Sequence, residues 1–351
     1  MAREKNTGRP DPLGDTDQSG DPAASRIPMG RGDRVDQREH LRVRVAWYYY
    51  VEGLTQAELA EQVGISRSIV NRILAQCRDT GVIQVRVNSP LAPCVALEAA
   101  LTREFGLRKA LVVPTPAYER NLPHILGAQA GEYLSDMADE LNSLGVGWGR
   151  TLWNTLKHVR RMRHPGLSIV SLLGGLHRTS AVSAYETATR LAEILGAECY
   201  YLAAPVYAGS EESRRVLREQ DFIREVMHRA QECDMALVSA GDLTGQATMR
   251  RLGLVSDRDA HELTEAGAVG DVLGHYLDDR GSLVDHPLNQ RVIAFDPRGL
   301  RELPQAVLVS GGQRRIPIIR AALRAGYANV LITDEQSAKA LIPAERRPAE
   351  D

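Results

Sequence analysis

The sequence has few cysteines, and the four that it has lie far apart in the chain. Cys77, Cys94, Cys199 and Cys233 form no C-x-x-C pair, and none of them lies beside a cluster of histidines. A structural zinc site needs such a pair, and a disulfide scaffold needs a denser set. The sequence therefore argues against a structural metal and against a disulfide framework, and it favours reduced, mostly buried thiols in a cytosolic protein.

The sequence also lacks an apolar run long enough to span a membrane, and it lacks a signal peptide. We therefore expect a cytoplasmic protein without a membrane partner. The chain has no large excess of charge of either sign. It contains 43 Lys and Arg and 45 Asp and Glu, which gives a net charge of -2. Any contact with nucleic acid must then come from a local patch. The nine histidines do not cluster, and the pattern assigns no catalytic residue, cofactor or metal.

The stretch 53–74 has the pattern of two helices joined by a tight turn. Thr55 and Glu58 have the spacing of a capping box, and Gly64 is placed to end the first helix. The second helix has an apolar face for burial and a polar outer face suited to base edges and phosphates in a major groove. The residues that we expect to meet DNA are Thr55, Gln56, Ser66, Arg67, Ser68, Asn71 and Arg72. The alternative is an ordinary helical hairpin with a solvated outer face.

The composition changes along the 351 residues, which is enough chain for more than one domain. Residues 1–35 have little apolar content, and we expect a disordered tail. A helix-turn-helix DNA-binding domain is expected over 36–88, a linker helix over 89–105 and an α/β domain over 106–345. The linker helix is a candidate spacer or dimerising element.

Within the small domain, a helix is expected to run from Asp36 to Val51. The run Trp47-Tyr48-Tyr49-Tyr50 should supply rings to its core. Residues 82–87 alternate with a period of two and predict a strand, either a wing or an exit strand.

After Gly106, short apolar runs alternate with segments of helical length. The expected strands cover 110–113, 168–173, 199–202, 235–238, 291–295, 306–309 and 330–332. Examples of the expected helices are 122–141, 181–195 and 213–230. Strands buried on both faces and separated by helices predict an open parallel sheet, and so an α/β fold.

Glycine-rich loops follow several of these strands, where open α/β sheets bind ligands. In Gly145-Val146-Gly147-Trp148-Gly149-Arg150-Thr151, small residues, a following helix and the Arg and Thr side chains would suit phosphate. Two further loops also follow strands: Gly174-Gly175 and Gly311-Gly312-Gln313-Arg314-Arg315. The arginines of the later loop suit a further contact with an anion. In Gly267-Ala268-Val269-Gly270-Asp271, the carboxylate could accept hydroxyl protons from a sugar or polyol. Each loop alone could be an ordinary turn, and Asp271 could be a helix cap.

The helix-turn-helix run 53–74, with Ala46-Trp47-Tyr48-Tyr49 before it, resembles the SorC family of bacterial sugar-responsive transcriptional regulators. Further segments are similar to family motifs and follow in the family's order: 146–152, 171–175, 266–271 and 331–335. The resemblance covers about 37–341, nearly everything but the tail.

The resemblance implies a winged-helix-like DNA-binding domain and a larger Rossmann-like domain of the glucosamine-phosphate deaminase and ribose-phosphate isomerase type. It implies a homo-dimer or tetramer on double-stranded operator DNA, with a sugar phosphate or polyol as effector and no catalysis. The residues expected at the effector are Gly147, Trp148, Gly149, Arg150, Thr151, Gly174, Gly175, Asp271, Gly311, Gly312 and Arg315. Family members often have Lys where Arg315 stands. Arginine cannot form a Schiff base, so we expect ionic, non-covalent recognition.

A second hypothesis is an active sugar-phosphate isomerase or deaminase fused to a DNA-binding module. Such an enzyme needs a general base placed in its pocket. No base stands in a clear motif position in this sequence. A third hypothesis, an architectural DNA-binding protein without an effector, leaves the glycine loops and the size of the second domain unexplained.

Overall fold

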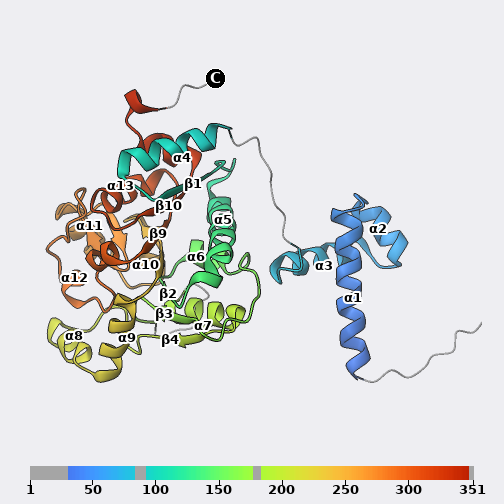
Figure 1. The fold of residues 1–351 in the computed structure, drawn as a ribbon, viewed down its shortest axis with the longest axis horizontal. Coiled ribbons are helices and arrows are strands. Elements are labelled where there is room, and N and C mark those ends of the chain that lie inside the picture. Colours follow the sequence, from blue (N-terminus) through green and yellow to red (C-terminus); the bar gives the residue numbers. More distant parts are fainter. Residues whose placement is uncertain (1–30, 84–91, 177–182, 348–351) are drawn as a thin grey trace, which may run out of the picture. The chain divides into compact units, whose positions relative to one another are not determined.

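The computed structural model describes residues 31–83, 92–176 and 183–347. These residues form two compact units, divided between Cys77 and Arg78, and each unit is described by itself (Figure 1). The domain limits expected from the sequence stay a prediction. Within the described ranges, no helix is both long enough and apolar enough to cross a membrane.

The first unit consists of three helices: α1 (Arg31–Tyr50), α2 (Gln56–Val63) and α3 (Arg67–Asp79). The expected capping box is present at the start of α2. The Thr55 N–H donates to Glu58 Oε2 at 2.8 Å, and the Glu58 N–H donates to Thr55 Oγ1 at 3.3 Å. These two hydrogen bonds satisfy backbone donors that the helix itself leaves free.

The three helices close over a small apolar core. Its buried residues are Val45, Ala46, Leu59, Val70, Ile73, Leu74 and Cys77. The buried face of α3 agrees with the prediction from its apolar spacing. In α2 the buried residue is Leu59, whereas Ala60 and Val63 are only half-buried. Gly64 ends α2 with a φ of 69°, a conformation that a residue without Cβ adopts easily.

Two expectations about α1 are wrong. The helix begins at Arg31, five residues before the expected start at Asp36. Trp47 is 56% exposed and does not fill the core. The helix turns Val45 and Ala46 inward, and each further residue moves about 100° around the axis, which carries Trp47 outward. The three tyrosines that follow it are half-buried. The expected strand over 82–87 falls mostly outside the described residues.

The second unit is built on a sheet of seven parallel strands in the order β1-β10-β9-β5-β2-β3-β4. The strands are β1 (Lys109–Val113), β2 (Ser143–Val146), β3 (Ser168–Ser171), β4 (Glu198–Tyr200), β5 (Met235–Val238), β9 (Gln305–Val309) and β10 (Val330–Asp334). A small antiparallel sheet is formed by β6 (Ala240–Gly241), β7 (Gly270–Val272) and β8 (His275–Leu277).

Helices cover both faces of the parallel sheet, as Figure 1 shows. One face packs against α5 (Leu122–Met137), α6 (Arg150–Thr155) and α7 (Ala184–Leu195). The other packs against α4 (Ala92–Phe105), α9 (Asp221–Gln231), α13 (Ile316–Arg324) and α14 (Glu335–Leu341). Because strand side chains alternate, Val307 and Val309 enter the first core while Ala306 and Leu308 enter the second. The prediction of an α/β fold with an open parallel sheet is confirmed.

The remaining helices lie around the small sheet and at the chain's turns. They are α8 (Glu211–Arg218), α10 (Thr248–Arg251), α11 (Asp257–Glu265) and α12 (Pro287–Arg291), with 3-10 turns at Glu119–Asn121, Ala138–Glu140, Pro297–Glu302, Gln313–Arg315 and Ala344–Arg346. The expected helix over 213–230 is therefore two helices, α8 and α9.

The expected linker helix over 89–105 is not a free spacer. In the structure α4 packs on the sheet, with Leu97 and Leu101 buried. Glu98 Oε1 accepts the Val112 N–H of β1 at 2.9 Å. The helix therefore belongs to the body of the second unit.

Candidate functional site

A cavity opens at the carboxyl ends of β2 and β5, which are neighbours in the sheet. After β2 the chain continues to β3 on one side, and after β5 the next strand of this sheet is β9 on the other side. Such a reversal leaves a crevice between the two connections, and open α/β sheets bind ligands there. The cavity contains about 610 Å³ of empty space, its open mouth included.

Five segments of the chain line the cavity. Its residues are Pro123, Trp148, Gly149, Arg150, Thr151, Ser239, Ala240, Gly241, Asp242, Ala247, Thr248, Met249, Asp271, Leu273 and Arg315. The lining thus combines two arginines and two aspartates with hydroxyl and apolar groups.

The loop after β2 brings Trp148 to Thr151 to the cavity. The Gly147 N–H donates to Leu237 O at 2.9 Å, which fixes the start of the loop against β5. Gly149 has a φ of 117°, a backbone conformation that residues with a Cβ rarely adopt. It leads directly into α6. Because α6 has only six residues, its dipole is weaker than that of a long helix, and an anion here would depend mainly on the side chains of Arg150 and Thr151.

Arg315 reaches the cavity from the turn after β9. Its Nη1 donates to Gly311 O at 3.0 Å, and its Nε lies 3.8 Å from Asp242 Oδ2. Burial lowers the pKa of Arg315, Asp242 opposes this shift, and the positive charge of Arg150 adds to it. An anion bound between the two arginines would relieve that repulsion.

Asp271, on β7, is buried at the base of the cavity. Burial raises its pKa to about 7, and the nearby charge of Asp242 also raises it. The Gly274 N–H, which donates to Asp271 Oδ2 at 3.1 Å, and Arg315 oppose the rise. Near neutral pH this carboxyl is therefore present in both forms, and it can accept from or donate to a hydroxyl group. It lies in a strand and is not a helix cap.

Six of the expected effector residues line the cavity: Trp148, Gly149, Arg150, Thr151, Asp271 and Arg315. The other five do not: Gly147, Gly174, Gly175, Gly311 and Gly312. Their backbones hold the loops together instead. The Gly174 and Gly175 N–H groups donate to Ile293 O and Ala204 O, and the Gly312 N–H donates to Asp334 Oδ1 and Ser337 Oγ.

Sequence reasoning did not assign Asp242 to the site. The feature that could have indicated Asp242 is its position in the chain. It lies four residues beyond the end of β5 and so at the carboxyl edge of the sheet. Thr248 and Met249 of α10 were missed as well. Nothing in their local sequence indicates a site, because the fold of the 239–249 segment brings them to the cavity.

The outer face of the helix-turn-helix carries the residues expected to meet DNA. Thr55, Ser66, Arg67, Ser68, Asn71 and Arg72 are exposed, and Gln56 is half-buried. Arg67 Nε lies at 3.5 Å from Gln56 Oε1 and connects α3 to α2. The Ile69 N–H donates to Ser66 Oγ at 3.4 Å, a weak cap at the start of α3. This face is free to contact a groove, while the opposite face of α3 fills the core.

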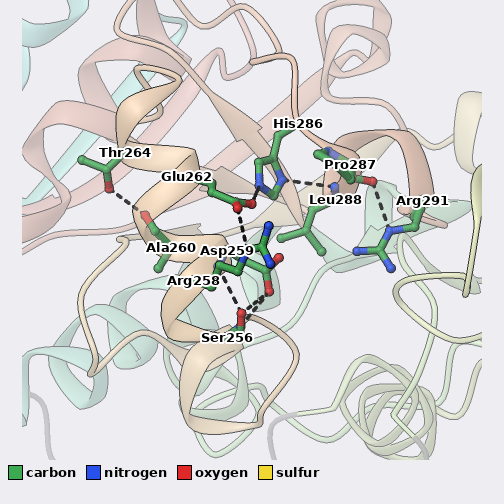
Figure 2. A network of polar contacts seen from close by, with 10 residues as sticks. All are labelled: Ser256, Arg258, Asp259, Ala260, Glu262, Thr264, His286, Pro287, Leu288 and Arg291. Atoms are coloured by element: carbon green, nitrogen blue, oxygen red, sulfur yellow. Dashed lines mark hydrogen bonds and ion pairs between the residues drawn. The ribbon is translucent and has the colours of Figure 1, made fainter.

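A second polar group lies between α11 and α12 (Figure 2). Among the described residues, Asp259, Glu262 and His286 place possible metal-ligating atoms within 4.8 Å of one another. His286 is buried, and its Nε2 lies 3.6 Å from Glu262 Oε2. Its Nδ1 accepts the Leu288 N–H at 3.2 Å. The neutral ring therefore carries its proton on Nε2, which leaves that atom no lone pair for a metal.

The two carboxylates of this group have other partners. Glu262 Oε1 accepts from Arg258 Nε at 2.7 Å, and this hydrogen bond lowers the pKa of Glu262. Asp259 Oδ2 accepts from the N–H and the hydroxyl of Ser256 in the capping box of α11. The donor set does not fit a metal ion, and the group connects α11 to α12.

Family models match both units. The model described as "Putative sugar-binding domain" matches residues 89–343, and the model described as "Crp-like helix-turn-helix domain" matches residues 44–91. The first match covers more than half of the chain and includes all residues that line the cavity.

Curated relatives match along most of the chain. The deoxyribonucleoside regulator of Bacillus subtilis is 31% identical, with 87% of this chain and 98% of that protein aligned. The erythritol catabolism regulatory protein EryD of Brucella abortus is 30% identical over 88% of this chain and 98% of its own length. The full-length sorbitol operon regulator SorC from Klebsiella pneumoniae shares the fold, with a TM-score of 0.66 and 21% identity over 87% of this chain and 98% of that one. The chain belongs to the SorC family of DNA-binding transcriptional regulators with a sugar-binding domain.

Proposed function

We propose that this regulator binds a phosphorylated sugar or sugar alcohol in the cavity between β2 and β5, and that binding changes its affinity for operator DNA. The observation that carries the proposal is the shared lining: Arg150 and Arg315 lie in the same cavity as Asp242 and Asp271. Two relatives are named for deoxyribonucleosides and for erythritol catabolism, which supports a carbohydrate or polyol ligand.

The arginines and Thr151 would bind the phosphate group. A guanidinium can donate two parallel hydrogen bonds to phosphate oxygens. Thr151 is buried, so its hydroxyl would contribute where little water competes. Because arginine cannot form a Schiff base with an aldehyde, the ligand would be bound without a covalent bond.

The carboxylates would bind the hydroxyl groups of the ligand. A sugar or polyol presents several O–H donors, and carboxylate oxygens are strong acceptors. Asp242 and Asp271 lie within electrostatic range of one another, so a chain of hydroxyls can span both. A ligand of this class needs no cofactor to bind.

The regulator would act in the cytoplasm, as a homo-dimer or tetramer on double-stranded operator DNA. Helix-turn-helix proteins bind paired half-sites about one helical turn apart, which requires two recognition helices at a fixed spacing. A ligand that favours one arrangement of the effector domains would change that spacing.

A thermal-shift screen of the purified full-length chain tests the proposal. Sugar phosphates, the matching free sugars and the matching polyols are compared at equal concentration. We expect a phosphorylated compound to raise the melting temperature, since a ligand that binds only the folded state stabilises it. A rise with free sugars or polyols alone would contradict the phosphate assignment, and no rise with any compound would contradict the effector site.

A second candidate function is catalysis on a sugar phosphate. One observation favours it: the pKa of Asp271 is raised to about 7, where a carboxylate can serve as a general base. We propose that the site binds without turnover, because the curated relatives are named as regulators. A product assay with the compound found in the screen decides between the two, since an activity abolished by Asp271→Asn would establish an enzyme.

A further inference from the structure

The most basic stretch of the second unit is remote from the cavity. Residues 157–164, here called the basic segment, read Lys-His-Val-Arg-Arg-Met-Arg-His and contain no acidic residue. They follow α6 and lead toward the start of β3. The segment therefore lies toward the amino ends of the strands, whereas the cavity opens at the carboxyl ends.

Backbone hydrogen bonds hold the basic segment in place. The Arg160 N–H donates to the buried Ser135 Oγ at 2.9 Å. The N–H groups of Met162 and His164 donate to Ile194 O and Leu195 O, at 3.3 and 2.8 Å, at the end of α7. The segment is thus ordered before any partner binds, which reduces the entropic cost of binding.

The side chains of the basic segment are divided between the core and the solvent. Val159 is buried and Met162 packs against the core below α5, α6 and α7. Arg160, Arg161 and Arg163 are exposed. Three arginine side chains of the segment are therefore accessible to solvent.

Acidic side chains do not neutralise this surface. Arg160 forms an ion pair with Asp136 at 2.7 Å, but no ion pair within the described ranges involves Lys157, Arg161 or Arg163. Burial lowers the pKa values of His158 and His124, and the charge of Lys157 lowers both further, while Asp79 opposes the shift of His124. The positive potential therefore extends over the neighbouring histidines.

We propose that the basic segment binds the phosphate backbone of duplex DNA, in addition to the contacts of the helix-turn-helix. The protein belongs to a family of DNA-binding regulators, so DNA is the polyanion that it meets. Residues 31–77 contain seven arginines against six Asp and Glu, and supply little net charge. Phosphate contacts provide much of the affinity for DNA, and the basic segment adds three unpaired cations.

The test is the salt dependence of DNA binding by the full-length protein. Arg161→Gln/Arg163→Gln is compared with the unmodified chain by fluorescence anisotropy on a labelled duplex of random sequence, because phosphate contacts do not depend on sequence. If both arginines contact phosphates, the slope of log affinity against log salt becomes shallower by about 1.8, at about 0.9 per contact. Arg280→Gln/Arg324→Gln removes two exposed charges elsewhere on the same unit and should leave the slope unchanged.

Two results would overturn this proposal. One is an unchanged slope for the first double variant, or an equal change in the control. The other is a change in oligomeric state without DNA, measured by light scattering, which would assign the surface to a second copy of the chain. Equal melting temperatures of the three proteins exclude misfolding. The test involves no effector, so its result is independent of the proposed ligand.

Discussion

Asp271 places an ionisable carboxyl in a buried position. Its pKa is raised from 3.8 to about 7, first by burial and then by Asp242. A group with a raised pKa in the folded state binds its proton more tightly there than in the unfolded chain. For an acid, folding is then favoured at low pH, and stability is lost as the pH rises from the unfolded value toward the folded one. Each pKa unit corresponds to about 1.4 kcal/mol.

The first prediction concerns the direction in which Asp271 changes the stability of the protein with pH. Without ligand, the ionisation of Asp271 in a buried site should lower the melting temperature of the unmodified chain relative to Asp271→Asn as the pH rises from about 5 to about 7. Asp271→Asn cannot ionise, so the difference between the two melting temperatures should change over this range. Differential scanning calorimetry measures both curves, and the exposed Asp139→Asn is the control. Parallel curves for Asp271→Asn and the unmodified chain would contradict the raised pKa.

The second prediction concerns the anion contacts. Arg150→Ala/Thr151→Ala should lose the thermal stabilisation by the compound found in the screen, since both side chains line the cavity. The effect is measured as the difference in melting temperature with and without ligand. Arg160→Ala/Ser168→Ala, outside the cavity lining, should keep the full shift. A double variant at 150 and 151 that still gains stability from ligand would place the phosphate elsewhere.

The site could be predicted only where the local sequence carried the signal. Gly149, Arg150 and Thr151 stand at a strand-to-helix turn, and both that turn and its ligand preference can be derived from residue type. Gly174 and Gly311 have the same local signal, yet neither glycine lines the cavity, and Arg315 is the residue of the Gly311 loop that reaches it. The order of the strands decides which of several similar loops faces the cavity. The sequence of a single loop does not encode that order.

Among the elements, α3 is the one whose function follows from its two faces. Val70 and Leu74 are buried, while Arg67 and Arg72 are exposed on the side opposite the core. The third prediction is that Arg67→Ala and Arg72→Ala weaken operator binding, by roughly 1–3 kcal/mol for a base contact and less for a phosphate contact. A gel-shift titration on an operator selected from a random pool measures the loss, and Arg44→Ala on α1 is the control. If both variants bind as the unmodified chain does, α3 is not the recognition helix.

Strands could be predicted where they were strongly apolar and were missed where they were not. The strand β2 reads Ser-Leu-Gly-Val. Its glycine and serine make it resemble a loop, although its neighbour β5 is apolar throughout. The opposite error occurs at 291–295. Val292 and Ala294 are buried as a strand would be, but they form isolated bridges to Tyr207 and Leu173 outside the main sheet. An apolar run encodes burial, and its partner depends on the rest of the fold.

At the scale of the whole molecule, the alternation of strands and helices was enough to predict a parallel sheet with two covered faces. The alternation could not give the strand order. That β2 lies between β5 and β3 depends on how the chain between these strands packs. The cavity is a consequence of that order. It forms where the chain changes its direction across the sheet, so its position became visible only with the topology.

The last prediction concerns the thermodynamic coupling between ligand binding and DNA binding. If the ligand changes the affinity for operator DNA by some factor, DNA must change the affinity for ligand by the same factor, because the four binding free energies close a cycle. We expect a factor in the range of about 5 to 150, measured by isothermal titration of the ligand with and without the selected operator, and by anisotropy of the operator with and without the ligand. Arg150→Ala/Thr151→Ala should still bind DNA but show no coupling. Equal affinities in both arms for the unmodified chain would mean that the cavity does not control DNA binding.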